Sequence, residues 1–345
     1  MTSVHQVRII TQDERDVFFE CRNDEDVISA ALRQDIYLMA SCREGGCATC
    51  KGFCSEGDYR MGKVSVQALP PDEEEEGQVL LCRCYPETDI EVEVPYTYDR
   101  ISFSPEDLCF EAEITEVSQI SSNVYRLCLK RIGTNQQIKL AAGQYYELQI
   151  PGTETWRSYS PANTENNDGV MEFLIRVLPD GKFSKFLMHD AQIGQTVHLK
   201  GPSGVFGLKE NGFTPRFFVA GGTGLAPILS MVRHMKAWEE PQQSVIYFGV
   251  NTEDEIFYVD ELNRLADEMP NLTVRNCVWK ATDTWNGEKG SVVDILRRDL
   301  VETGAKPDLY LCGPPGMVDA TYAVCTEVGI PKEHVYLEKF LPSIS

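Results

Sequence analysis

Four cysteines constrain this chain more than any other feature of its sequence. Three of them share one short loop with the spacing Cys-x4-Cys-x2-Cys, and the fourth follows far along the chain; they are Cys42, Cys47, Cys50 and Cys82. Thiolates that serve one metal centre must converge on it. The segment between Cys50 and Cys82 therefore has to fold back onto the loop.

This spacing is that of a plant-type [2Fe-2S] site. Gly45 and Gly46 lie inside the loop and let backbone N–H groups turn toward the sulfur atoms, where hydrogen bonds help to set the reduction potential. A zinc site or buried free thiols are the alternative, but zinc sites usually pair two short Cys clips. Cys84 lies two residues beyond Cys82 and competes for the fourth position. We favour Cys82 because it follows the apolar run 79–81, which would hold it toward the core.

The remaining cysteines fit a different role. Nothing in the sequence marks export, so a disulfide framework is not expected. We expect buried, small side chains at Cys21, Cys109, Cys128, Cys277 and Cys325.

The composition is that of a folded protein with several domains. At 345 residues, with 42% hydrophobic and 25% charged side chains, the chain is too long for one ordinary core. It contains no run of about 18 apolar residues that could cross a bilayer. Its start lacks the charged and apolar segments of a secretory signal, so we expect a cytoplasmic protein.

The net charge of the chain restricts the classes of partner that it can bind. A net charge of −21 disfavours nucleic acid, because the phosphates would be repelled. Residues 1–98 hold 20 acidic and 9 basic side chains, which is about half of the acidic excess. This asymmetry favours an acidic docking face in the first third of the chain.

The pattern of apolar residues predicts a multidomain α/β and β protein. Residues 1–98 begin with alternating strands and a helix at 26–34 before the cysteine loop. Residues 103–208 hold short strands separated by Gly and Pro, with one helix at 182–189, which favours an antiparallel barrel. Residues 212–345 alternate strands with helices and predict a doubly wound parallel sheet.

Two motifs in the middle domain suit a flavin. The first is Arg157, Ser158, Tyr159 and Ser160, which combines an Arg for a pyrophosphate, an aromatic ring for stacking and a hydroxyl for a ring nitrogen. The second is Gly181, Lys182, Phe183 and Ser184, which opens a helix whose N–H groups and dipole favour a phosphate. Arg176 lies on the strand between them, where a cofactor contact and an exposed strand charge are equally reasonable.

Two glycine-rich turns in the last third each follow an apolar strand, at the carboxyl end where such sheets bind ligands. They are Gly222, Thr223 and Gly224 in one turn, and Cys312, Gly313 and Pro314 in the other. Neither is Gly-x-Gly-x-x-Gly, and each alone could be a tight turn only. Residues 250–255 carry three acids and no Lys or Arg, which favours the free ribose of NADH over a 2′-phosphate, with a solvated acidic loop as the alternative.

These motifs, in this order, resemble the ferredoxin–NAD reductase family, and most closely the reductase components of soluble methane monooxygenases. The stretches that carry the resemblance are residues 41–51, 66–76, 79–83, 95–103, 157–163, 221–232 and 311–317. The resemblance implies an N-terminal β-grasp ferredoxin domain, a FAD-binding barrel and an NADH-binding domain.

The resemblance also implies roles for single residues. The cluster ligands would be Cys42, Cys47, Cys50 and Cys82. Arg157 would contact the pyrophosphate, Tyr159 would stack on the isoalloxazine, and Ser160 would lie near the reactive flavin nitrogen. The residues that resemble phosphate-binding and NADH-binding turns are Gly181 to Ser184, Gly222 to Gly224, and Cys312 to Pro314, with Cys312 near the nicotinamide. Glu338 and Phe340 resemble the tail that approaches flavin and nicotinamide, and the implied catalytic residues are Ser160, Cys312 and Glu338.

The implied activity is conversion of a two-electron donor into single electrons, because flavin can release singly what NADH gives as a pair. None of the five His residues has a Glu three positions before it, as a helical di-iron site requires, so the acceptor is another protein. We expect a monomer that docks a di-iron hydroxylase on its acidic ferredoxin domain. The alternatives are the reductase of another oxygenase (phenol, toluene or alkene monooxygenase, or Rieske dioxygenase), a non-catalytic zinc module, and a flavin oxidase.

Overall fold

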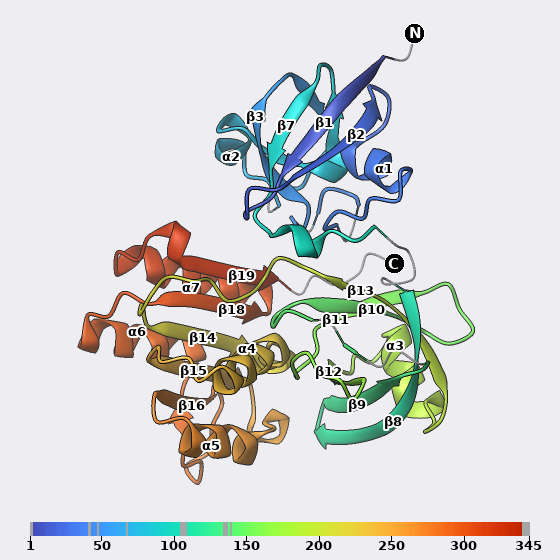
Figure 1. Cartoon of the computed structure of the whole chain (residues 1–345). Coiled ribbons are helices and arrows are strands. Elements are labelled where there is room, and N and C mark those ends of the chain that lie inside the picture. The colour runs from blue at the N-terminus through green and yellow to red at the C-terminus, as the bar shows by residue number, and fades with distance from the viewer. Residues whose placement is uncertain are drawn as a thin grey trace. The chain divides into compact units, whose positions relative to one another are not determined.

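A computed structural model describes residues 3–40, 43–46, 48–66, 68–103, 109–133, 137–138 and 140–339. By its internal contacts the chain divides into two compact units, residues 1–110 with 201–205 and residues 111–200 with 206–345. Figure 1 shows the elements of both units. No helix in the described ranges is long and apolar enough to cross a membrane.

A mixed sheet with a packed helix forms the first unit, as expected of a β-grasp domain. Its described strands are β1 (Val4–Ile10), β2 (Asp16–Arg22), β3 (Lys51–Glu56), β5 (Gln78–Leu80) and β7 (Ile90–Glu93), in the order β2-β1-β7-β3-β5. β1 and β7 are parallel, and the other neighbours are antiparallel. Helix α1 (Val27–Leu32) begins at Asp26, whose carboxylate accepts a hydrogen bond from Ser29 N at 3.0 Å.

The segment between the cysteines has more structure than its sequence pattern predicts. It contains β4 (Tyr59–Met61) and helix α2 (Pro71–Glu75) and leads into the 3₁₀ turn Leu81–Arg83, and β4 pairs with β6 (Cys84–Pro86) just beyond it. The acidic run 72–76 forms most of α2. Pro71 occupies its first turn and the acids Asp72, Glu73 and Glu74 follow, which suits the positive end of the helix dipole.

The middle of the chain forms a curved sheet. Its described strands are β8 (Cys109–Ser121), β9 (Val124–Arg131), β10 (Tyr145–Gln149), β11 (Trp156–Tyr159), β12 (Val170–Arg176) and β13 (Thr196–Ser203), in the order β11-β10-β13-β8-β9-β12. An isolated antiparallel bridge joins Pro161, just after edge strand β11, to Phe173 on the opposite edge strand β12. The expected barrel-type sheet is therefore confirmed, and the bridge brings its two edges together.

The last part of the chain is the predicted doubly wound sheet, and all its paired neighbours are parallel. Its described strands are β14 (Arg216–Gly221), β15 (Ser244–Val250), β16 (Leu272–Val278), β17 (Glu288–Lys289), β18 (Asp308–Gly313) and β19 (Val335–Lys339), in the order β17-β16-β15-β14-β18-β19. Its helices are α4 (Leu225–Ala237), α5 (Val259–Glu268), α6 (Val292–Thr303) and α7 (Pro315–Glu327).

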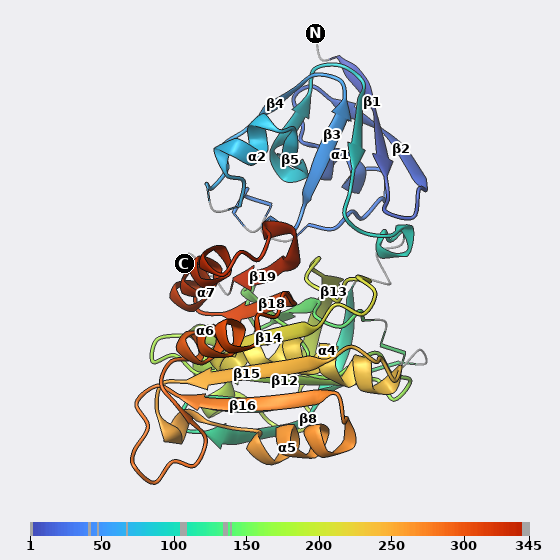
Figure 2. The same ribbon diagram turned by 90° about the vertical axis from the view of Figure 1, so that its left-hand side faces the viewer.

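Helices cover both faces of this sheet (Figures 1 and 2), and alternating residues of its central strands enter two different cores. Phe218 and Ala220 of β14 pack with α4 and α5, whereas Phe217 and Val219 pack with α6 and α7. Both faces of the strand are apolar because both are covered, as expected for a parallel sheet. The α4 side also includes middle-domain residues such as Phe206, so the flavin and nicotinamide domains share a core.

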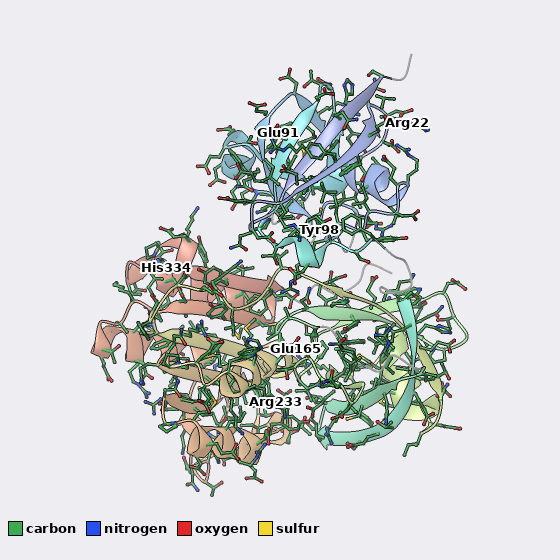
Figure 3. The ribbon with its side chains drawn as sticks, viewed as in Figure 1. Arg22, Glu91, Tyr98, Glu165, Arg233 and His334 are labelled. Carbon is green, nitrogen blue, oxygen red and sulfur yellow. The ribbon has the colours of Figure 1, made fainter. Side chains whose placement is uncertain are left out.

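A buried ion network joins the same two domains. Glu172 on β12 is 7% exposed and binds Arg126 Nε at 2.9 Å and Arg233 of α4 at 2.6 Å. Tyr258, which precedes α5, donates its hydroxyl to the same carboxylate. Burial would raise the pKa of Glu172, but Arg233, Tyr258 and Arg126 outweigh it and lower that pKa. Figure 3 labels Arg233 among these side chains.

A second connection runs from the β8–β9 turn to the loop after β15. Asn123 donates its side-chain amide to Glu255 at 3.0 Å, and Ser122 N donates to the Asp254 carbonyl at 2.9 Å. Two acidic residues of that loop are thus bonded to the flavin domain, Glu255 through its side chain and Asp254 through its backbone carbonyl. The loop after β15 is fixed against the barrel from outside its own sheet.

Several sequence expectations need correction. The helix expected at 182–189 is a short α-helix, α3 (Lys182–Lys185), that continues as a π-helical turn, Phe186–Asp190. Strand β11 contains Arg157, Ser158 and Tyr159 of the first flavin motif, and Ser160 follows it. Cys109 was expected to be buried but is exposed at the start of β8, while the other cysteines of that set are buried.

Removal of the Glu172 carboxylate should destabilise the two joined domains. We expect Glu172→Ala to lower the free energy of unfolding by about 3–5 kcal/mol, because Arg126 and Arg233 would remain partly buried without their counter-charge. Urea denaturation followed by circular dichroism measures this. The control is Glu268→Ala, which breaks exposed pairs with Lys236 and Arg264 and should cost less than about 1 kcal/mol. Equal losses in the two variants would contradict the assignment.

Candidate functional site

The cysteine loop is built from left-handed turns. Arg43, Gly45 and Ala48 all have positive φ, near 54°, 75° and 59°, which turns successive peptide groups around the loop. A Cβ at Gly45 would lie 2.9 Å from Lys63 O, so the loop can pack this closely only with glycine there. Cys42 and Cys47 lie outside the described residues.

The two described ligand candidates are neighbours. Cys50 and Cys82 are 3% and 2% exposed, and Leu81 N donates to Cys50 O at 2.9 Å. This bond brings the distant cysteine back onto the loop, as convergence on one centre requires. Buried thiols beside a loop of inward-turned N–H groups fit an iron–sulfur cluster.

Cys84 points to a different environment. It is fully buried on β6 opposite Met61 of β4, and desolvation raises the pKa of its thiol, with Cys54 and Cys21 as its charge neighbours. Its surroundings are therefore those of a buried core position. This geometry favours Cys82 as the fourth ligand.

The two flavin motifs meet in space. The ring of Tyr159 on β11 lies 5.0 Å from that of Phe183 in α3, and burial raises the pKa of the Tyr159 phenol. Ser184 is buried, and its Oγ accepts a hydrogen bond from Leu178 N at 2.9 Å, so it closes the turn that precedes α3. Arg176 is exposed at the end of β12, a position that fits both a cofactor contact and an exposed strand charge.

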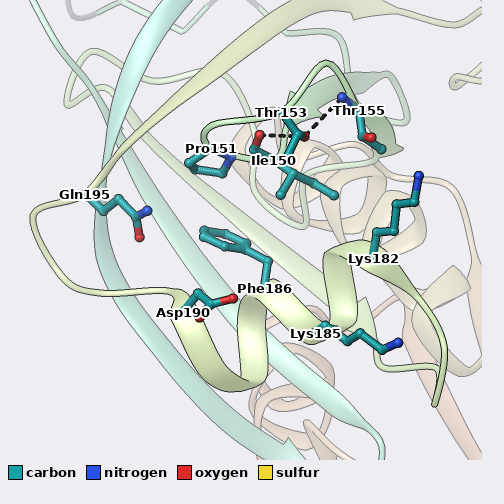
Figure 4. A pocket seen from close by; sticks show the side chains of 9 residues that line it. All are labelled: Ile150, Pro151, Thr153, Thr155, Lys182, Lys185, Phe186, Asp190 and Gln195. Carbon is teal, nitrogen blue, oxygen red and sulfur yellow. Dashed lines mark hydrogen bonds between the residues drawn. The ribbon is translucent and has the colours of Figure 1, made fainter.

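A cavity of about 390 Å³ adjoins the start of α3 (Figure 4). Lys182 and Lys185 line one side of it, and the threonines of the turn after β10, Thr153 and Thr155, line the other. Asp190 also lines this cavity, so side chains of both charges surround it beside the predicted phosphate-binding turn.

Three predicted catalytic residues come together from three strands. Glu338 on β19 is the register partner of Cys312 on β18. Ser160 follows β11 and lies close enough to Glu338 to lower its pKa, yet burial dominates and raises the pKa of Glu338 to about 8. Ser160 Oγ and Glu338 Oε2 are both buried, and among the described residues neither has a hydrogen-bond partner beyond the weak interaction between these two groups. Phe340 lies outside the described residues.

Unsatisfied buried oxygens are rare in folded proteins. Ser160 Oγ of the flavin domain and Glu338 Oε2 of the nicotinamide domain lie close to each other here. Cys312 is also fully buried, which raises the pKa of its thiol. The pair of free oxygens therefore marks a position where a bound polar group would find partners.

The two glycine turns pack against each other. A Cβ at Gly224 would lie 2.1 Å from Cys312 O, and a Cβ at Gly221 would lie 2.7 Å from Met317 Sδ. Both turns follow the carboxyl ends of adjacent parallel strands, β14 and β18. The glycines thus permit an approach of the two turns to each other that any side chain would block.

The acids after β15 have distinct partners. Glu255 Oε2 accepts from Asn251 and its Oε1 from Asn123. Glu253 Oε1 accepts from the backbone and hydroxyl of Thr282 at 2.6 and 2.7 Å, and these bonds lower its pKa. The sequence analysis did not single out Trp279, which shares this edge. Its signal would have been an aromatic residue directly after an apolar parallel strand.

Three family models match the chain. Residues 10–87 match a 2Fe-2S iron-sulfur cluster binding domain, residues 111–207 an oxidoreductase FAD-binding domain, and residues 218–323 an oxidoreductase NAD-binding domain. Together they follow the order of domains that the sequence pattern predicts.

Similar proteins are reductases. Methane monooxygenase component C of Methylosinus trichosporium is 48% identical over 86% of this chain and 87% of its own length. The anthranilate 1,2-dioxygenase electron transfer component of Acinetobacter baylyi is 35% identical over 98% of each chain. Among solved structures, Amycolatopsis cytochrome P450 reductase covers 98% of this chain and 100% of its own, with a TM-score of 0.76 and 27% identity.

Substitution of the candidate ligands should separate Cys82 from Cys84. We expect Cys82→Ser to lose most of its bound iron and acid-labile sulfide, and Cys84→Ser to keep both, because the residue before Cys82 is hydrogen-bonded to Cys50 while Cys84 lies buried on β6. Iron analysis and the electron paramagnetic resonance signal of the reduced protein measure this. Loss of iron in Cys84→Ser with intact circular dichroism would contradict it.

The raised pKa of Glu338 predicts a pH dependence of stability. Folded protein keeps a proton that unfolded protein has released, so the free energy of unfolding falls as pH rises from the ordinary value of 4.5 to about 8. Glu338→Gln cannot ionise and should show a smaller fall in Tm between about pH 5 and about pH 8.5. We expect a difference of about 2–4 °C by calorimetry. The exposed Glu333→Gln should follow the parent protein, and a parallel fall in Glu338→Gln would oppose the idea.

Proposed function

Because the chain belongs to the family of NAD-dependent reductase components of multicomponent oxygenases, we propose that it delivers electrons from NADH to the di-iron hydroxylase of a soluble methane monooxygenase. The observation that carries this choice is its 48% identity with methane monooxygenase component C over 86% of the chain. The dioxygenase and propane monooxygenase relatives are about a third identical over similar lengths, and their oxygenases are the second candidate acceptors.

The site residues fit a flavin. The half-buried Tyr159 ring offers a stacking face, the buried Ser160 Oγ can meet a ring nitrogen, and Lys182 can meet a phosphate. Arg157 lies on the same strand as Tyr159 and would contact the pyrophosphate. Bound FAD would take two electrons from NADH and release them singly to the [2Fe-2S] cluster.

The proton-holding group of the site is Glu338. Since its pKa is raised to about 8, its carboxyl is mainly neutral at pH 7 and can donate a hydrogen bond. Its register partner Cys312 is small and uncharged, so it leaves room for a flat ring. We assign Ser160, Cys312 and Glu338 to the place where nicotinamide meets flavin.

The cluster ligands in this proposal are Cys42, Cys47, Cys50 and Cys82. The adjacency of Cys50 and Cys82 supports the last two. The proposed domains are residues 1–98, 103–208 and 212–345, and the three family-model matches lie inside these bounds.

We place hydroxylase docking on the acidic ferredoxin domain. Glu75 and Glu76, at the end of α2, are exposed and belong to the densest acidic run of the chain. A basic face on the hydroxylase would be attracted over about a Debye length, roughly 8 Å at physiological salt. The acidic excess thus favours fast association with a basic partner.

A visible spectrum under anaerobic conditions tests the electron path. We expect flavin and iron–sulfur absorbance that both bleach on addition of NADH, followed by reoxidation on addition of methane monooxygenase hydroxylase. A colourless protein would instead support a zinc module, and fast NADH consumption with oxygen alone would support a flavin oxidase. Faster reoxidation by a Rieske dioxygenase than by the hydroxylase would assign the second candidate acceptor.

Charge changes on α2 test the docking face. Glu75→Gln with Glu76→Gln should lower the rate constant for electron transfer to the hydroxylase several-fold at low salt, and added salt should shrink the difference. The control, Asp267→Asn with Glu302→Gln, makes the same change of charge at exposed positions of the nicotinamide domain. A salt-independent rate, or equal losses in the control, would refute acidic docking.

A further inference from the structure

Trp279 lies at the edge of the parallel sheet where ligands bind. It directly follows β16, and its backbone N donates to Val250 O, at the end of β15, at 3.0 Å. The next residue repeats the contact, because Lys280 N donates to Asn251 O at 2.8 Å. The backbone at Trp279 is therefore fixed, even though the residue follows the end of its strand.

The side chain of Trp279 is nevertheless open. It is 60% exposed, whereas Trp285 in the same loop packs against the core and donates its indole N–H to Glu288 O at 3.2 Å. Lys280 Nζ lies 5.7 Å from the centre of the Trp279 ring, on one of its faces. An exposed indole on a fixed backbone is a platform for a flat ring.

The position suits the far end of a dinucleotide. The order β16-β15-β14-β18 places Trp279 three strands from Cys312, which is about 14 Å at a strand spacing of ~4.8 Å. An extended dinucleotide with its nicotinamide at Cys312 would cross the glycine turn after β14 and reach β16 with its adenine.

Glu253 provides a ribose partner at the same edge. Thr282 binds its Oε1 twice, which lowers its pKa and keeps it ionised near Trp279. The neighbouring acids differ, since Glu255 binds Asn123 of the flavin domain and the Asp254 carbonyl binds Ser122. An ionised carboxylate here accepts a hydrogen bond from a ribose hydroxyl and repels a 2′-phosphate.

We propose that the indole of Trp279 stacks on the adenine of NADH while Glu253 accepts a hydrogen bond from the adenosine ribose. This inference extends the nicotinamide-binding function of the domain and does not depend on which oxygenase receives the electrons. It names the residues that would give NADH a higher affinity than a nucleotide without adenosine.

The test compares NADH with reduced nicotinamide mononucleotide, which lacks adenosine, using ferricyanide as the acceptor. For Trp279→Ala we expect the KM for NADH to rise about tenfold, or about 1.4 kcal/mol, within the range of base–aromatic stacking. The kcat/KM for the mononucleotide should change less than about twofold. Calorimetric titration with ADP-ribose should show the same tenfold loss of affinity without any turnover.

Matched variants separate stacking from a general effect. Trp279→Phe keeps a stacking face and should recover most of the affinity for ADP-ribose, whereas Trp279→Leu should not. Trp238→Ala removes a tryptophan that is 66% exposed after α4, at the opposite edge of the same sheet. It should change neither the KM for NADH nor the kcat/KM for the mononucleotide. Equal effects of Trp279→Ala on both nucleotides, or an unchanged affinity for ADP-ribose, would overturn the proposal.

The ribose contact has its own readout. Glu253→Gln should weaken ADP-ribose binding and narrow the preference for NADH over NADPH, because the repulsion of a 2′-phosphate is removed while Lys280 stays nearby. An unchanged preference would remove Glu253 from the proposal and leave the stacking test standing.

Discussion

The parallel register of the C-terminal sheet is the constraint on which the rest of the site depends. Because β14, β15, β16, β18 and β19 run the same way, all their carboxyl ends meet at one edge. Cys312 and Glu338 face each other only because β18 and β19 are in that register. The sheet in turn depends on strands that are apolar on both faces, since each face is covered by its own pair of helices.

Burial has two opposite electrostatic outcomes in this molecule. At Glu172 two arginines and a tyrosine outweigh desolvation, so the carboxylate stays charged and joins two domains. At Glu338 no cation of the described residues contributes, so desolvation wins and the carboxyl keeps its proton to about pH 8. The first arrangement contributes stability, and the second leaves polar atoms without partners where a cofactor would supply them.

Sequence patterns predict the order and type of most elements because periodicity reports which face is buried. The glycine turns and the Tyr159 motif can be predicted from short stretches of sequence. The approach of Cys50 and Cys82 can be predicted because ligands of one cluster must converge. Helix α2 was missed because its acids suggest a loop until their place at a helix N-terminus is known. The Glu172 network could not be foreseen, since it depends on residues far apart in sequence being brought together. Trp279 had a sequence signal, its place directly after an apolar strand, but its exposure depends on the fold. Cys109 shows the limit of residue-type preference, because strand β8 begins at an exposed position there.

The bonds from Asn123 to Glu255 and from Ser122 to Asp254 bear on how such proteins can be recombined. The loop after β15 belongs by sequence to the nicotinamide domain, yet its shape is partly set by a two-residue turn of the flavin domain. A chimera cut cleanly between the two domains would separate the loop from that turn. The smallest part that can be exchanged between such proteins is therefore the nicotinamide domain together with the β8–β9 turn. A cut at the domain boundary in the sequence would leave the loop after β15 without part of its support.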